Sequence, residues 1–245
     1  MNSVRKALLV LEAVADHQPV GVSELASQLG QPKSSVQRAL ETLHGAGWIR
    51  PSSGERTRWE LTFRASRLAR KAGSHFGLRE AVLPHMEELR RQTSETVHLA
   101  VFDDSEIVLI ERLESPHAVR HVEPLGGRAS MLVTATGKAI LARLSTEEVD
   151  AIHAATVERN DPGTPVPQRD ALELELEEVR RLGYATTSSW RDGVFATGVA
   201  IIGPSGGPIA ALSISTPETR SDEENRRTQA QLLLDHGRQI NERLG

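Results

Sequence analysis

The sequence predicts an α+β protein with an N-terminal winged helix-turn-helix and a second domain built on a central antiparallel sheet. Three observations predict this class. Residues 23–43 read as two short amphipathic helices joined by a tight turn. A hairpin pattern follows them directly. From Thr93 onward the apolar residues change from helical spacing to the alternation that is typical of strands.

The first three helices are predicted from their apolar stripes and from the residues that stop them. Residues 3–15 form an amphipathic helix, and residues 23–29 form a second one that a glycine ends. A third helix spans residues 32–43, because proline suits the first helical turn. Ser34 and Gln37 have the spacing of a capping box, which predicts the start of that helix.

The outer face of the third helix is short, polar and able to form hydrogen bonds. A helix that enters the major groove of DNA requires such a face. Arg38 and Gln37 are predicted to read base edges, because Arg can bind guanine with two hydrogen bonds and Gln can do the same with adenine. Lys33 and the hydroxyl groups at the helix start suit phosphates.

A hairpin over residues 48–61 is predicted to form the wing, with a turn of proline, serine and glycine in its middle. Arg50, Arg56 and Arg58 lie on or near it, where they can meet phosphates or the minor groove. The alternative is a solvated hairpin with scattered arginines.

The two ends of the chain differ in charge. The first 75 residues carry 11 Lys and Arg against 6 Asp and Glu, a balance of +5, whereas the rest carries 18 against 27, a balance of -9. This segregation favours phosphate contact by the N-terminal part, and a chance excess on a solvated surface is the alternative. A break at residues 73–75 separates two predicted linker helices. It places a DNA-binding domain at 1–75 and a second domain at 76–245.

The second domain is predicted as strands in meander order with helices at both ends. Its strands are expected at residues 97–101, 107–110, 119–123, 184–188, 199–202 and 209–215. A small-residue helix is expected at 134–144. Further helices are expected to begin at a capping box of Ser145 and Glu148, at Asp170, and at a capping box of Ser221 and Glu224.

Composition excludes several classes of site. The chain has no cysteine, so disulfides and thiolate metal sites are absent. No apolar run approaches the roughly 20 residues that cross a bilayer, and the N-terminus lacks the apolar core of a signal peptide. We therefore expect a soluble, cytoplasmic protein without membrane contact. No glycine loop of the phosphate-binding types occurs, so no cofactor is expected.

Three patterns that resemble enzyme sites are better explained otherwise. Residues 203–207 fit G-x-S-x-G around Ser205, but a strand pattern follows instead of the helix that a nucleophile elbow needs. His117 and His121 lack a third ligand at metal-site spacing, and histidines at a sheet rim are usually solvated. Glu111 and Glu114 are expected to form an exposed charge cluster, not an acid/base pair. We therefore expect neither catalysis nor a metal site.

Four stretches together resemble the IclR family of bacterial transcription regulators, over nearly the whole chain. They are SELASQLGQPKSSVQRALETLHGAGWI, SETVHLAVFDDSEIVLIERLES, TATGKAILARL and LEEVRRLGYA, in this order and spacing. The resemblance implies a winged helix-turn-helix followed by an effector-binding domain related to the GAF fold. It also implies a homodimer, or a pair of dimers, on a DNA operator. The residues that match the family's recognition helix are Lys33, Ser34, Ser35, Gln37, Arg38 and Thr42.

The resemblance also implies an effector pocket, and there the chain departs from the family pattern. Ser130, Met131 and Leu132 stand where many members have Pro-Leu-His. Trp190 and Ala196 stand near the usual acidic residue and cysteine. A pocket that lacks that carboxylate and gains an indole is expected to prefer a flatter or more apolar ligand. A packed or surface position for Trp190 is the alternative.

These patterns predict a ligand-responsive DNA-binding regulator. Its partners would be a near-palindromic double-stranded operator and a small organic effector, such as an aromatic or carboxylic acid. One alternative is an effector-binding protein whose winged domain contacts other proteins. The other is a serine hydrolase that uses Ser205.

Overall fold

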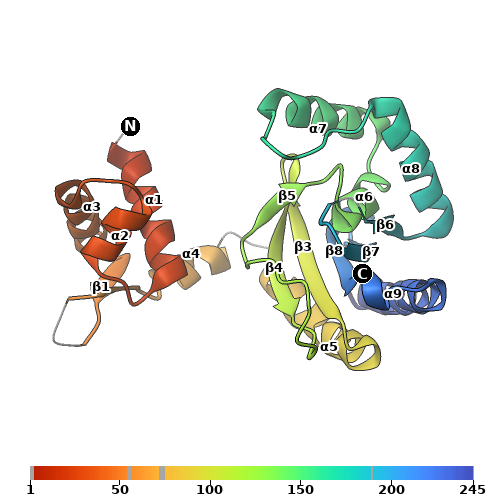
Figure 1. Ribbon diagram of the computed structural model, residues 1–245, viewed down its shortest axis with the longest axis horizontal. Coiled ribbons are helices and arrows are strands. Elements are labelled where there is room, and N and C mark those ends of the chain that lie inside the picture. Colours follow the sequence, from red (N-terminus) through yellow and green to blue (C-terminus); the bar gives the residue numbers. More distant parts are fainter. Residues whose placement is uncertain (1–2, 54–56, 72–74, 189, 245) are drawn as a thin grey trace. The chain divides into compact units, whose positions relative to one another are not determined.

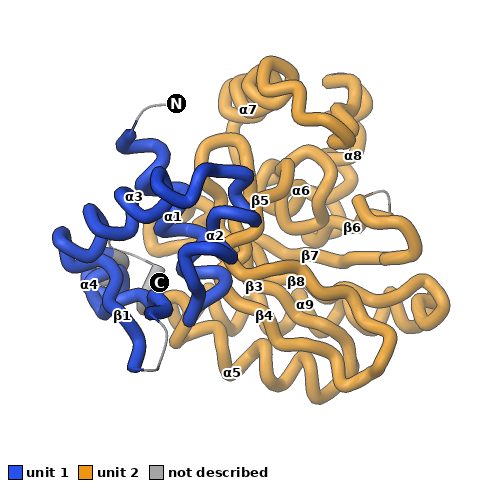
Figure 2. The backbone as a smooth tube through the Cα atoms, turned by 60° about the vertical axis from the view of Figure 1, so that its left-hand side comes forward, with its two compact units in different colours: residues 1–76 blue, residues 77–245 orange. Residues whose placement is uncertain are grey.

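The chain divides into two compact units, Met1–Phe76 and Gly77–Gly245, in the computed structural model. The structure describes residues 3–53, 57–71, 75–188 and 190–244. Figure 1 labels the elements, and Figure 2 colours the first unit blue and the second orange.

The first unit is a three-helix core followed by a hairpin and a further helix. Its elements are α1 (Ser3–His17), α2 (Val22–Gln28), α3 (Lys33–Gly45), β1 (Ile49–Pro51), β2 (Trp59–Leu61) and α4 (Arg64–Lys71). β1 pairs antiparallel with β2, with Ile49 opposite Leu61, so the predicted wing is confirmed. The helices and the hairpin share one apolar core that includes Val10, Val14, Leu25, Val36, Leu40 and Ile49.

The turn between α2 and α3 forms as predicted, but the predicted cap of α3 is wrong. Gly30 adopts a left-handed conformation with φ of 58°, which ends the preceding helix. α3 then starts one residue after Pro32, whose carbonyl accepts the backbone N–H groups of Ser35 and Val36. Ser34 therefore lies inside the first turn and makes no capping bond.

The second unit contains one six-stranded antiparallel sheet. Its strands are β3 (Thr96–Asp103), β4 (Glu106–Leu113), β5 (Arg128–Ser130), β6 (Ala185–Thr187), β7 (Val194–Ile202) and β8 (Pro208–Pro217), in the order β5-β4-β3-β8-β7-β6. The predicted meander order is wrong, because β8 pairs with β3 at the centre. Both strands are buried over nearly their whole length, so each needs a neighbouring strand on both sides and helices on both faces.

The predicted strand at residues 119–123 is also wrong. This segment is irregular, and the exposed fractions of Val119 and Val122 are 70% and 45%. Arginine side chains hold its backbone, since Arg220 donates to the carbonyl of Val119 and Arg112 donates to that of Glu123. β5 occupies the edge position instead.

Helices cover both faces of the sheet (Figure 1). Apolar residues of α5 (His75–Thr93) and α9 (Glu223–Leu244) pack on one face. Those of α6 (Ala135–Leu141), α7 (Thr146–Arg159) and α8 (Arg169–Leu182) pack on the other, and η1 (Glu218–Arg220) joins β8 to α9. Within the described ranges, no helix is long and apolar enough to span a membrane.

Two of the capping predictions in this unit have opposite outcomes. The Ser145 and Glu148 box at the start of α7 is confirmed in both of its hydrogen bonds. The box at Ser221 is wrong, because Asp222 accepts the backbone N–H of Asn225 at 2.8 Å and α9 begins one residue after it. An aspartate is an equally suitable cap, so sequence spacing did not discriminate between the two.

Candidate functional site

The side of α3 that faces away from the core presents the polar residues predicted to contact DNA. Lys33, Ser34, Arg38 and Thr42 are exposed, and Ser35 and Gln37 are half-buried. The opposite stripe of the helix is buried, because Val36, Leu40 and Leu43 lie in the core of the first unit. The geometry of an amphipathic helix therefore brings all six predicted residues to one surface.

The side chain of Arg38 is available to an external partner. Its guanidinium forms no hydrogen bond or ion pair with any residue that the structure describes, while its backbone carbonyl accepts the hydroxyl of Thr42. Gln37, in contrast, donates to Glu41 at 2.9 Å, and Ser35 accepts from Lys6 at 2.6 Å. Contact with DNA would cost these two residues an existing hydrogen bond.

Arg58 forms contacts within the first unit, and its predicted phosphate contact stays a prediction. Its guanidinium binds both carboxylate oxygens of Glu24 at 2.7 and 3.1 Å, and it also donates to the carbonyl of Pro19. The backbone N–H of Gly21 and then the Arg58 side chain lower the pKa of Glu24. Arg58 thus joins the wing to α2. The predicted contact at Arg56 lies outside the described residues.

If Arg58 acts through the wing, both Arg58→Ala and Glu24→Ala should weaken binding to duplex DNA, although Arg58→Ala also removes a positive charge and the bond to Pro19. Each variant removes the same link between the wing and α2. The measurement is a fluorescence anisotropy titration at a series of salt concentrations. A salt slope reduced by about 0.9 in Arg58→Ala alone would instead indicate a direct phosphate contact.

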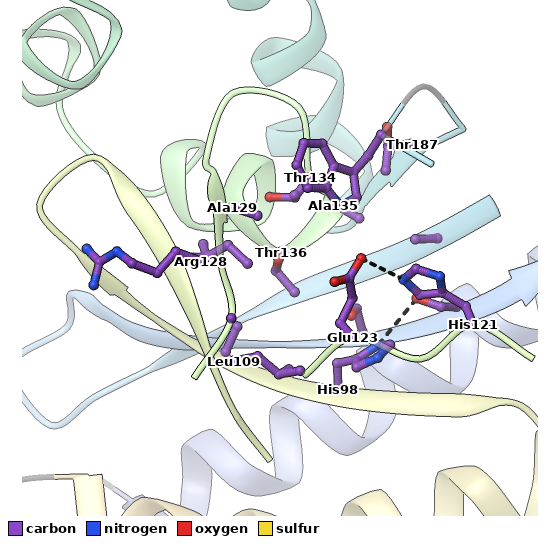
Figure 3. A pocket seen from close by; sticks show the side chains of 17 residues that line it. His98, Leu109, His121, Glu123, Arg128, Ala129, Thr134, Ala135, Thr136 and Thr187 are labelled. Atoms are coloured by element: carbon purple, nitrogen blue, oxygen red, sulfur yellow. Dashed lines mark hydrogen bonds and ion pairs between the residues drawn. The ribbon is translucent and has the colours of Figure 1, made fainter. Parts of the chain in front are cut away.

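The second unit contains a cavity between its sheet and the start of α6 (Figure 3). The cavity has a volume of about 80 Å³. Strands β3, β4, β7 and β8 form its floor. The segment 121–129, which runs into β5, the end of β6 and Trp190 form other walls. The lining residues with hydrogen-bonding or aromatic side chains are His98, His121, Glu123, Arg128, Thr134, Thr136, Thr187, Trp190, Ser213 and Ser215.

Two histidines lie side by side at this cavity. The rings of His98 and His121 meet edge to face, with their centroids 5.9 Å apart. His98 is only 6% exposed, and burial lowers its pKa to about 3. Its Nδ1 lies 3.3 Å from the hydroxyl of Ser215, while Nε2 is buried without a partner among the described residues. Burial also lowers the pKa of His121, although Glu123 lies 3.3 Å away. Both rings are therefore neutral at pH 7.

The charged residues at the cavity are already paired. Arg128 binds Asp103 at 2.9 Å and Glu106 at 2.6 Å. Glu123 binds Arg191 at 2.7 Å in addition to its contact with His121. Among the residues that the structure describes, the walls of the cavity therefore offer hydrogen-bonding groups and apolar surface, but no unpaired cation that could bind a carboxylate.

The predicted effector residues separate into two groups. Trp190 and Ala196 line the cavity. Met131 and Leu132 are fully buried in the core between the sheet and helices α6 to α8, and Ser130 accepts the backbone N–H of Leu132. Ser130 ends β5, and Met131 and Leu132 lie in the turn that leads into α6. These three residues support the wall of the cavity but are not among its described lining residues.

Sequence reasoning missed most of the polar lining. His98 lies in β3, which the alternation of apolar residues predicts as a strand. A histidine within that alternation is the sequence signal that could have indicated its place at the cavity. His121 was expected to be solvated at the rim, and the structure instead places it, half-buried, in the cavity wall. His117 is exposed as expected. In the described part of the chain, no group of three or more His, Cys, Asp or Glu can hold a metal ion.

The other patterns considered for catalysis have structural roles. Residues 203–207 form the hairpin turn between β7 and β8, as predicted, with the N–H of Gly203 donating to the carbonyl of Gly207 at 2.9 Å. Glu111 was expected in an exposed cluster, but it is 8% exposed and pairs with Arg79 at 2.5 Å. Glu114 pairs with Arg112 and Arg120.

Comparisons with protein families match both units. The model described as IclR helix-turn-helix domain matches residues 3–53, and the model described as Bacterial transcriptional regulator IclR C-terminal matches residues 70–242. Two curated relatives come from Escherichia coli K12. The HTH-type transcriptional regulator KdgR is 29% identical over 100% of this chain and 93% of its own length. The transcriptional repressor IclR is 30% identical over 90% of this chain and 81% of its own length.

Solved structures agree with the same fold. The Thermotoga maritima IclR structure has a TM-score of 0.78 and 26% identity, and the match covers 100% of this chain and 99% of that one. An IclR homolog from Microbacterium hydrocarbonoxydans, solved in complex with 4-hydroxybenzoate, has a TM-score of 0.78 at 24% identity, with 99% of each chain covered.

Proposed function

Because the chain belongs to the IclR family of bacterial transcriptional regulators, we propose that it binds a near-palindromic operator and that a small organic effector modulates this binding. As an IclR-type regulator it has a DNA-binding and an effector-binding domain, and it is not an enzyme. The proposed domains are residues 1–75 and 76–245, and the proposed place of action is the cytoplasm.

The proposed DNA contacts are those of α3. Arg38 and Gln37 read base edges in the major groove, while Lys33 and the hydroxyl groups of Ser34, Ser35 and Thr42 bind phosphates. The single observation that carries this proposal is the exposed guanidinium of Arg38 on a helix whose other side is buried. Two copies of α3 in a homodimer, or in a pair of dimers, would read half-sites about one helical turn of DNA apart.

The proposed effector site is the cavity of the second unit. It is lined by residues from strands β3 to β8 and from α6, and it combines apolar walls with a few hydrogen-bonding groups, as ligand sites do. The relative solved with 4-hydroxybenzoate supports a small organic ligand for a protein of this fold. Coupling between an effector and operator affinity is typically worth about 1–3 kcal/mol.

The variant Arg38→Ala tests the DNA proposal. Selection from a random duplex pool with the wild-type chain first supplies a preferred sequence. We expect Arg38→Ala to weaken binding to that sequence by roughly 5-fold to 150-fold, since one good base contact is worth about 1–3 kcal/mol. Binding to random duplex should change little, because the phosphate contacts remain. The measurement is a competition gel shift at fixed salt.

Arg143→Ala is the matched control, because it removes the same charge from an exposed position of the second unit. It should leave both affinities unchanged. Equal losses by Arg38→Ala on selected and random DNA would contradict base reading by Arg38. Binding that does not weaken with salt would contradict phosphate contacts altogether.

A further inference from the structure

The size of the cavity limits its ligand to a compact molecule. Its volume of about 80 Å³ is roughly half that of the engineered cavity of about 150 Å³ that binds benzene. Ala100, Ile107 and Leu109 give the floor an apolar surface, and Trp190 adds an aromatic wall. A small molecule with an apolar part fits these walls.

Apart from the ion-paired Arg128 and Glu123, the polar groups at the cavity are uncharged hydrogen-bonding groups. His98 is the most informative, because it is more than nine-tenths buried and its Nε2 has no partner within the described structure. A buried polar atom without a partner is costly, so a ligand group that bonds to it would be strongly favoured. The hydroxyl groups of Ser213, Ser215 and Thr136 lie in the same lining and are also largely buried.

The ion pairs at the cavity argue against a carboxylate ligand. Arg128 already has two carboxylate partners, and Arg191 is paired with Glu123. A ligand carboxylate would therefore lose its hydration without gaining a cation, and it would lie near the negative charge of Glu123. Burying a charge without a partner is far more costly than burying a neutral group that can form hydrogen bonds.

We infer that the cavity selects an uncharged, compact ligand with a carbonyl, amide or hydroxyl group, which bonds to the free ring nitrogen of His98, over carboxylate analogues of the same shape. This inference rests on the proposed function, in which the cavity is the effector site. It replaces the expectation of a carboxylic acid with a neutral compound.

Matched pairs of amides and carboxylates test this inference, because each pair differs mainly in charge. The probes are propionamide against propionate and lactamide against lactate. Isothermal titration calorimetry of the full chain at neutral pH measures each affinity without DNA. We expect an amide to bind, and each amide that binds to do so at least about tenfold more tightly than its carboxylate.

Variants of His98 identify the contact. Asn places an amide near Nδ1 and leaves nothing at the position of Nε2, so His98→Asn should weaken amide binding at least fivefold, by about 1 kcal/mol. His98→Gln extends its amide toward Nε2 and should retain most of the affinity. His117→Asn, at an exposed histidine outside the cavity, is the control and should have no effect.

Three results would overturn the inference. They are a carboxylate that binds more tightly than its amide, no binding by any amide at millimolar concentration, and unchanged amide affinity in His98→Asn. None of them affects the DNA proposal, since the Arg38→Ala comparison is made without ligand. Conversely, a chain that binds amides but shows no sequence preference on DNA would overturn the proposed function alone.

Discussion

Replacing Gly137 with alanine is expected to unfold the second unit. A Cβ atom at this position would lie 2.3 Å from both the Cα and the carbonyl oxygen of Met131. Both are backbone atoms, so no side-chain rotation relieves the overlap, and α6 would have to move away from the turn that precedes it. All seven residues of α6 are buried. We therefore expect a loss of at least about 3 kcal/mol, which is a large part of the stability of an ordinary domain.

Gly77→Ala is the matched control for this prediction. Gly77 is exposed in α5, and no atom of the described residues lies within 4 Å of the position of its Cβ. Alanine should leave stability unchanged or raise it by up to about 1 kcal/mol, since alanine favours helix more than glycine does. Urea unfolding followed by circular dichroism measures both variants. A Gly137→Ala midpoint equal to that of the wild type would show that α6 can shift at little cost.

The second unit is also expected to lose stability as the pH falls below about 6.5. Burial lowers the pKa of His98 from its ordinary value of 6.5 to about 3 in the folded chain. Between these values the unfolded chain binds a proton that the folded chain excludes, so stability falls with decreasing pH. The contribution of His98 to the free energy of unfolding is complete above pH 6.5. Below that pH the free energy of unfolding falls by about 1.4 kcal/mol per pH unit, or by about 4 kcal/mol at pH 3.

A second pair of histidines should add to this acid sensitivity. The Nδ1 atoms of His85 on α5 and His236 on α9 lie 3.0 Å apart, so one ring donates and the other accepts. Burial is the main cause that lowers the pKa of each. Protonation of both rings would remove the acceptor and place two positive charges together between these helices.

His98→Asn separates the contribution of His98 from those of the other titrating groups. Asparagine can still form a hydrogen bond with Ser215, but it does not titrate. Urea unfolding at a series of pH values measures the free energy of unfolding. Between pH 6.5 and pH 4 this free energy should decline less steeply in the variant, with a slope that corresponds to about one proton fewer taken up on unfolding. Identical slopes in the variant and the wild type would mean that His98 is protonated in the folded chain.

Patterns that repeat over a few residues were sufficient to predict most of the secondary structure. The apolar stripe of α3 leaves Arg38 on the outside, and the left-handed Gly30 ends α2. Alternation predicted the pairing of β3 with β4, and the hairpin after Gly203 excluded a nucleophile elbow. Each of these depends on side-chain spacing within one element or on one backbone conformation, so neighbouring residues determine it.

The tertiary structure alone decided which distant residues meet. The order of the sheet follows from β8 returning beside β3, and the ion pair of Arg58 with Glu24 joins residues 34 positions apart. The cavity likewise forms because strand register places His98 opposite Ser213 and within hydrogen-bond reach of Ser215, and the irregular connection after β4 brings His121 against it. Local periodicity indicates which side of an element is buried. It contains no information about which element covers that side, because pairing and packing depend on the whole chain.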